Sequence, residues 1–192
     1  MGQRMPIGLQ LTGLVGSVIA LMIVLLAVVL YEFKTTGADY QHLLSVTVKN
    51  SITLLEAEDD FHQGLSELRG YIITRDPSRA KDTEDALKKA SEQLVIFADH
   101  AVNADSKARG EELRKAVSDY TEKTKDIIAL YERNDIKTAT AAATELRKKT
   151  DEIDALFDKA AKTQTSVQDQ QLELLNSNVD HIFIIVLVIS IV

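Results

Sequence analysis

An apolar run near each end of the chain restricts its fold more than any other feature. The first run, Leu14 to Tyr31, contains no charged residue over 18 positions. As a helix rising about 1.5 Å per residue, it would cross a hydrocarbon layer roughly 30 Å thick. The second run, Ile182 to Val192, has 11 residues, about half of the 20 that a helical span needs. We therefore expect both ends of the intervening segment to lie at a membrane.

These runs divide the chain into four predicted parts. A cytoplasmic N-terminus, 1–10, precedes a transmembrane helix over 11–33, and a second transmembrane helix begins within 182–192. A cleaved signal peptide is the alternative for the first run, but YEFKTTGADY follows it without a small-residue cleavage site. The second run is too short for a tail anchor, so we expect the sequence to be a fragment that stops inside its second crossing.

Charge around the first run indicates its orientation. Arg4 and the terminal amine precede the run and Lys34 follows it, which favours a cytoplasmic N-terminus. Residues 34–181 then form an extracytoplasmic domain, and we expect the protein in the bacterial inner membrane with this domain in the periplasm or outside the cell. The net charge of −7 argues against nucleic-acid binding, and the lack of cysteine excludes disulfides and cysteine-bound zinc.

The segment between the runs has the composition of long helices. Its apolar positions recur at alternating steps of three and four residues, which places one stripe of each helix against a partner. No alternating strand pattern is present. The four stripes extend from Tyr40 to Tyr71, from Ala80 to Ala101, from Leu113 to Tyr131 and from Ala139 to Leu174.

Short turns separate the stripes. Asp76-Pro77 ends the first helix and starts the second, because proline suits the first helical turn and aspartate can cap it. Asn103-Ala104-Asp105 closes the second helix, and Asn134-Asp135 ends the third and caps the fourth. Helices joined this closely pack antiparallel. The predicted fold is all-α, an up-down-up-down antiparallel four-helix bundle with a transmembrane helix at each end, and a coiled coil of another topology is the alternative.

Several stripe positions are polar or small where leucine would stabilise a bundle more. One interpretation is that they fix the register of the helices. The other is that the core is loosely packed and can shift between two arrangements on a small input. The positions are Thr47, Asn50, Gly64, Thr83, Thr124, Thr150, Gln164, Gln171 and Asn178.

We find no catalytic constellation and predict that this segment is not an enzyme. Asp59 and His62 form a carboxylate-histidine pair at i, i+3 spacing, whereas a di-iron bundle needs a Glu-x-x-His motif on two helices. Neither a phosphate-binding glycine loop nor an H-E-x-x-H motif occurs. We therefore predict no catalytic residues, no cofactor and no metal site.

The densest candidate for ligand binding is the segment that ends the first bundle helix, Ser66 to Arg79. Its arginines present planar donor forks that suit carboxylates and phosphates, and Gly70 leaves room for a close approach. The alternative is that Arg69 pairs with Glu67 or Glu58 and the other arginines are solvated at the turn. The predicted ligand-binding residues are Arg69, Tyr71, Thr74 and Arg75.

The order of these elements resembles a known family. A membrane span, a helix that closes on LRGYIITRDP, a YERNDIKTA turn and a second span are similar to the four-helix-bundle ligand-binding domain of bacterial methyl-accepting chemotaxis receptors. The resemblance implies a parallel homodimer whose first bundle helices face each other. It also implies a ligand near the distal end of the bundle, with Arg69 the position that best matches the arginines holding a ligand carboxylate, and Arg75 a weaker match.

The resemblance further implies a sensor that detects a small molecule, such as an anionic amino or organic acid, or a periplasmic binding protein. The fourth helix would carry the signal through the membrane to a cytoplasmic signalling domain. Similar bundles occur on sensor histidine kinases and diguanylate cyclases, which are alternative outputs. A membrane-tethered structural coiled coil without a ligand is a further alternative.

Overall fold

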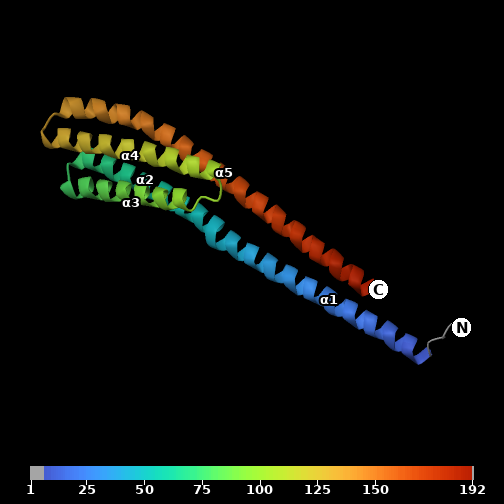
Figure 1. Ribbon diagram of the computed structural model, residues 1–192. Coiled ribbons are helices and arrows are strands. Elements are labelled where there is room, and N and C mark those ends of the chain that lie inside the picture. The colour runs from blue at the N-terminus through green and yellow to red at the C-terminus, as the bar shows by residue number, and fades with distance from the viewer. Residues whose placement is uncertain (1–6, 192) are drawn as a thin grey trace. The chain divides into compact units, whose positions relative to one another are not determined.

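The computed structural model describes residues 7–191, with side chains described over 13–187 except at 14 and 42. Described residues outside the short turns lie in helices, and none of them forms a strand (Figure 1). This confirms the all-α prediction, while residues 1–6 of the predicted cytoplasmic segment lie outside the described range. The elements are α1 (Ile7–His42), the π-helix η1 (Leu43–Val48), α2 (Lys49–Thr74), α3 (Pro77–Asp99), α4 (Ala104–Glu132) and α5 (Ile136–Ile191).

The chain divides into two compact units. The bundle unit comprises residues 43–169, and the terminal unit comprises α1 with the part of α5 from residue 170 onward. Helix α5 contributes to both units and contains no proline or glycine. Among the described residues, one helical run that begins at Val15 in the apolar part of α1 is long and apolar enough to cross a membrane.

Contacts between α2 and α3 show that these helices are antiparallel. Near the start of α2, Asn50 Nδ2 donates a hydrogen bond of 3.2 Å to the carbonyl of Phe97, near the end of α3. Near the end of α2, Glu67 forms an ion pair of 2.9 Å with Arg79, in the first turn of α3. The order of the contacts is reversed along the two helices, which run antiparallel in Figure 1.

Helix α5 packs antiparallel to α2 in the same way. Gln164 Nε2 donates a hydrogen bond of 3.0 Å to the carbonyl of Thr47, and His62 lies 3.7 Å from Asp154. Helix α4 runs beside the first part of α5 and is joined to it by a short turn (Figure 1). The bundle unit is therefore the predicted up-down-up-down four-helix bundle.

Aromatic rings fill the centre of the bundle. Phe61 of α2 contacts Tyr120 of α4 edge-on at 5.2 Å between ring centroids, and Phe157 of α5 at 5.8 Å. All three side chains are buried. Aromatic side chains bury large apolar areas, so this cluster joins three helices at one level.

Glycines let α3 approach its two neighbours closely. A Cβ atom placed on Gly64 of α2 would lie 2.9 Å from the Leu87 side chain of α3. One placed on Gly110 of α4 would lie 2.9 Å from the Phe97 ring and 3.2 Å from the backbone of Ala98. Both distances are shorter than normal packing contacts, so glycine is required for this separation of the helices.

The predicted polar stripe positions lie in the core of the bundle. Gln171 and Asn178, which belong to the terminal unit, are half-buried. The buried positions are Thr47, Asn50, Gly64, Thr83, Thr124, Thr150 and Gln164. Burial of this many hydroxyl and amide groups leaves some without partners: Asn50 Oδ1, Thr124 Oγ1 and Gln164 Oε1 accept no hydrogen bond from any described residue.

The turns follow the predicted signals with one correction. Arg75 adopts a left-handed conformation (φ 60°) after α2, and Asp76 caps α3 by accepting a hydrogen bond of 3.0 Å from the Ser78 amide. Asp135 accepts one of 3.2 Å from the amide of Thr138 and caps α5.

The correction concerns the turn after α3. This helix ends at Asp99, before the predicted turn, and Asn103 accepts a hydrogen bond of 2.8 Å from the Ser106 amide. Asn103 therefore caps the start of α4 instead of ending α3, because its extended backbone and side-chain oxygen suit an N-cap.

The segment η1 interrupts the α-helical hydrogen-bonding pattern at the start of the bundle. In a π-helix the backbone bonds span one residue more than in an α-helix. The Thr47 carbonyl accepts a hydrogen bond from Gln164 Nε2 and a second one, of 3.2 Å, from Ser51 Oγ. Gln168 Nε2 in turn donates to Ser51 Oγ at 2.6 Å. Gln164 of α5 thus donates directly to the irregular backbone, and Gln168 donates to the Ser51 hydroxyl that also bonds to it.

Candidate functional site

The main groove of the bundle unit lies between α2, α4 and α5, with a volume of about 520 Å³. Volumes of roughly 300–1,000 Å³ are typical of small-molecule sites. Its apolar surface comes from leucine, isoleucine and alanine side chains, and its polar surface from arginines, tyrosines and threonines. The lining residues are Leu65, Leu68, Arg69, Ile72, Tyr120, Tyr131, Thr140, Ala143, Thr144, Leu146, Arg147 and Thr150. We call this the arginine groove.

Two guanidinium groups from different helices line the arginine groove. Arg69 comes from α2 and Arg147 from α5, and both are exposed. Neither forms an ion pair with a residue that the structure describes, and no lining residue is acidic. The alternative in which Arg69 pairs with Glu67 does not occur, because Arg79 takes that carboxylate. The groove is therefore cationic within an acidic chain.

Two tyrosines form the α4 side of the groove. The Tyr120 phenol is hydrogen-bonded to Thr150. Burial raises the pKa of Tyr120, although the Thr150 hydrogen bond and the nearby positive charge of Arg69 oppose this shift. Tyr131 lies 3.3 Å, oxygen to oxygen, from the Thr140 hydroxyl. The Tyr120 phenol thus remains a neutral hydrogen-bonding group at neutral pH.

Of the four predicted ligand-binding residues, Arg69 lies in the groove and the other three lie beside it. Tyr71 is buried and packs edge-on against Tyr131 at 6.2 Å between ring centroids. Arg75 lies over the Tyr131 ring with its guanidinium carbon 3.5 Å from the centroid. Thr74 donates a hydrogen bond of 2.8 Å to a backbone carbonyl within α2. Tyr71 and Arg75 therefore support the wall that Tyr131 forms, and Thr74 is the last residue of α2.

Sequence reasoning missed Arg147. Its segment, TELRKKTDE, has the pattern of an ordinary charged helix face, and only the packing of α5 against α2 brings Arg147 to the groove that holds Arg69. Gly70 does provide the open space predicted beside Arg69, but the Arg79 side chain occupies it.

Carboxylates gather on the α2–α5 seam toward the centre of the bundle. Burial raises the pKa of Glu58, His62 opposes the shift, and Asp158 and Asp154 add to it. His62 pairs with Asp154 at 3.7 Å. No group of three or more potential metal ligands is arranged around a common point within the described part of the chain.

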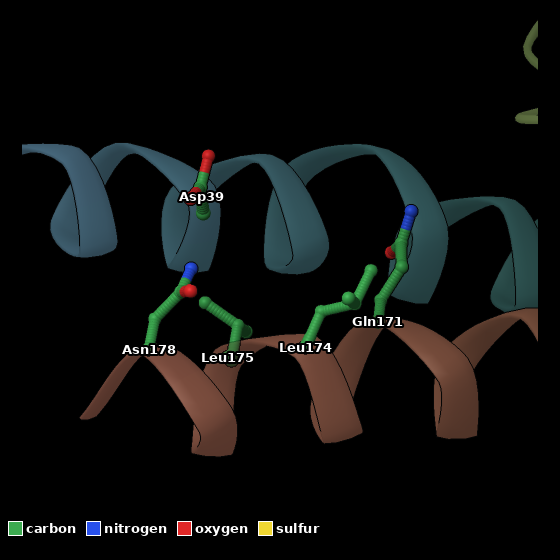
Figure 2. A pocket seen from close by; sticks show the side chains of 5 residues that line it. All are labelled: Asp39, Gln171, Leu174, Leu175 and Asn178. Atoms are coloured by element: carbon green, nitrogen blue, oxygen red, sulfur yellow. The ribbon is translucent and has the colours of Figure 1, made fainter. Parts of the chain in front are cut away.

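The terminal unit has a second, smaller groove of about 300 Å³ between α1 and α5. Figure 2 shows Leu174, Leu175 and Asn178 of α5 directed toward the α1 segment that carries Asp39. Gln171 completes the lining. This groove holds one charge and two amides, so it offers fewer converging polar groups than the arginine groove.

Comparison with known protein families identified a matching family model. The model of the CHASE3 domain family matches residues 41–178, which include α2, α3 and α4 together with η1 and most of α5. No curated protein and no solved structure gave a significant match to the chain.

Proposed function

The chain belongs to the CHASE3 domain family, and we propose that it is the extracytoplasmic sensor portion of a bacterial transmembrane chemoreceptor. CHASE3 is an extracellular sensor domain found in chemotaxis receptors and histidine kinases. The apolar part of α1 is consistent with a membrane-anchored sensor. In this proposal residues 11–33 cross the inner membrane, 34–181 lie outside it, and 182–192 enter it again.

The observation that supports direct sensing is the arginine groove. It places two guanidinium groups, from α2 and α5, that form no ion pair with a described residue around one cavity, and arginine binds carboxylates and phosphates through paired hydrogen bonds. A ligand that contacts both helices binds one relative position of α2 and α5 better than another. Such differential affinity is what a ligand needs to shift a conformational equilibrium.

Helix α5 is the element through which the signal would leave the groove. It is continuous from Ile136 to Ile191, about 84 Å at 1.5 Å per residue, and no proline or glycine interrupts it. A small shift of α5 in the bundle would therefore reach the residues proposed to enter the membrane.

The topology can be tested with single cysteines, because the chain contains none. Lys89→Cys and Lys115→Cys place thiols on exposed faces of α3 and α4. We expect a membrane-impermeant maleimide to label both in intact spheroplasts, and to label Gln3→Cys only after lysis. Labelling of the Lys89 and Lys115 positions only after lysis would contradict an extracytoplasmic domain.

Signal transmission can be tested by weakening α5 at an exposed point. Asp169→Gly with Gln170→Gly adds about 1 kcal/mol of helix destabilisation per position, whereas alanine at both positions keeps the helix. In the complete receptor, we expect the glycine pair to retain ligand binding and lose ligand-dependent output, and the alanine pair to retain both. Normal output from the glycine pair would contradict transmission through α5.

A histidine kinase is the second candidate for the whole receptor, because CHASE3 domains occur on both receptor types. The same sensor would then regulate autophosphorylation instead of a chemotaxis signalling domain. Ligand-dependent incorporation of phosphate from ATP into the complete receptor would favour the kinase. Ligand-dependent methylation of the receptor would favour the chemoreceptor.

We further propose that the sensor is a homodimer joined along α2. Exposed apolar side chains occur along this part of the chain: Ile52 and Leu55 of α2, three residues apart, are 50% and 59% exposed, and Leu44 of η1 is 49% exposed. Large exposed apolar groups at such spacing are typical of a helix that packs against another helix. Leu55→Cys should form a disulfide-linked dimer on mild oxidation, whereas Lys89→Cys, on α3, should not.

A further inference from the structure

We infer that the arginine groove selects organic dianions, and that it discriminates against α-amino acids of the same carbon skeleton. This inference rests on the proposed sensor function and narrows the ligand class. It follows from the chemistry of the groove: two cationic groups, several hydroxyls, an apolar surface and no carboxylate among the lining residues.

The two arginines favour a ligand with two negative groups. Arg69 and Arg147 belong to different helices, and neither is neutralised by a described carboxylate. Each guanidinium presents a planar fork that binds one carboxylate, so a ligand with two carboxylates can occupy both forks. A monocarboxylate would leave one guanidinium without a partner.

The absence of lining carboxylates disfavours an ammonium group. A partly desolvated ammonium group is stabilised by a nearby negative charge, which the lining residues do not supply, and the two guanidinium groups repel it. Asp154, whose negative charge acts on Tyr120, does not line the groove and pairs with His62 at 3.7 Å. One face of the Tyr131 ring is covered by Arg75 at 3.5 Å, so that face offers no cation–π site.

The remaining surface suits a short carbon chain that can carry a hydroxyl group. Leu65, Leu68 and Ile72 of α2 lie across from Ala143 and Leu146 of α5. The hydroxyls of Thr140 and Thr144 donate to backbone carbonyls of α5 at 2.8 and 2.9 Å, so their oxygen atoms remain as acceptors for a hydroxyl group of the ligand. Short dicarboxylates such as succinate and its 2-hydroxy derivative, malate, combine these features, and aspartate is the matched amino acid.

The test is calorimetric titration of the full chain in lipid nanodiscs with succinate, malate, aspartate and inorganic phosphate. We expect succinate or malate to bind at least tenfold more tightly than aspartate. Arg69→Gln and Arg147→Gln should each weaken this binding at least tenfold, with partial recovery in Arg69→Lys and Arg147→Lys. Arg114→Gln, an exposed arginine of α4 outside the groove, should have no effect. Circular dichroism of each variant checks that the bundle remains folded.

Several results would overturn the inference. Aspartate binding as tightly as succinate would show that the groove accepts an ammonium group, and would leave the sensor proposal intact. Sensitivity to Arg69→Gln without sensitivity to Arg147→Gln would exclude a ligand held by both arginines. Phosphate binding as tightly as the dicarboxylates would show a general anion site. Binding of none of the four compounds would also overturn the inference, whereas the sensor proposal is judged separately by the maleimide labelling.

Discussion

Helices α3 and α5 are held in the bundle in different ways. Helix α3 meets α2 and α4 where Gly64 and Gly110 allow close approach, and normal side-chain packing could not reproduce these separations. Helix α5 borders the arginine groove and two further grooves of about 260 Å³ each, which it forms with α4. Tightly packed interfaces resist displacement, whereas gaps leave side chains room to rearrange. The comparison indicates that α5 is the helix best able to shift.

The α2–α5 interface also differs from the interfaces of α3 in the polarity of its contacts. Its contacts include the bond from Gln164 to Thr47 and the pair between His62 and Asp154, with Phe61 and Phe157 as the main apolar link. Polar contacts of this kind contribute about 1 kcal/mol each, less than a buried aromatic side chain. The following variants test how far the stability of the bundle depends on each type of contact.

The largest effect is expected where α5 is attached most firmly. Phe157→Ala removes a fully buried ring from the central cluster and should lower the free energy of unfolding by about 3–5 kcal/mol. Phe157→Leu keeps most of the side-chain volume and should lower the free energy of unfolding much less. Urea unfolding of the chain in detergent, followed by circular dichroism at 222 nm, measures both. A decrease of less than about 1 kcal/mol in the free energy of unfolding would contradict the attachment of α5 through this aromatic cluster.

A smaller loss is expected on the α3 side. Gly110→Ala forces a methyl group against the Phe97 ring and the Ala98 backbone and should cost about 1–3 kcal/mol, despite the better helix propensity of alanine. Gly37→Ala is the matched control, because nothing lies within 4 Å of its Cβ position. The Gly37→Ala control should raise the free energy of unfolding by about 0.5–1 kcal/mol. Urea unfolding measures both variants. A higher free energy of unfolding for Gly110→Ala would contradict the difference in packing between α3 and α5.

Gln164→Leu should increase stability, by about 1 kcal/mol. It removes a buried amide whose Oε1 has no described partner, and the Thr47 carbonyl keeps the hydrogen bond from Ser51. Gln164→Ala should instead lower stability, because it leaves a cavity. If leucine destabilised the bundle as alanine does, the amide would be contributing net stability at this position.

The smallest effect is expected from Glu58→Gln. Burial raises the pKa of Glu58 above its ordinary value of 4.5, so its ionised form destabilises the folded state at neutral pH. This cost is present above the folded-state pKa and disappears as the pH falls below 4.5. Urea midpoints should therefore show a small gain for Glu58→Gln at pH 7 that vanishes at pH 4. A gain that is independent of pH would have another cause.

Local sequence signals predicted most of the bundle. The three-four spacing identified the central residues Phe61, Leu87, Val117 and Phe157, all of which are buried. Proline and capping residues located the turns, because these signals act over only a few positions.

The predicted apolar stripes are wrong where they extend beyond the bundle unit. Tyr40 is 53% exposed and Leu174 is 66% exposed, while Leu175 is buried instead. A spacing of 3.5 residues drifts from the 3.6 residues of a straight helix, so a stripe continued from Gln164 reaches Leu175, 11 residues later, rather than Leu174. Tyr40 precedes η1, whose wider turns alter the spacing. No local sequence pattern predicted this π-helix.

The candidate site was less predictable than the fold. Arg69 could be selected because it lies in an arginine-rich helix end, whereas Arg147 reaches the same groove only through the packing of α5 against α2. The grouping of Tyr71 and Arg75 around Tyr131 likewise depends on contacts between α2, the turn after it, and α4. Tertiary contacts of this kind are not encoded in the spacing of residues along one helix.

The hydrogen bond from Gln164 to the Thr47 carbonyl bears on how α5 can move. A buried amide donor has to keep an acceptor, since losing it costs about 1–3 kcal/mol. Carbonyl oxygens that face one neighbouring helix recur about once per turn, roughly 5.4 Å apart in an α-helix. Sliding of α5 would therefore favour a few separate resting positions over a continuous range, so that a graded occupancy of ligand is converted into a stepwise displacement of the helix.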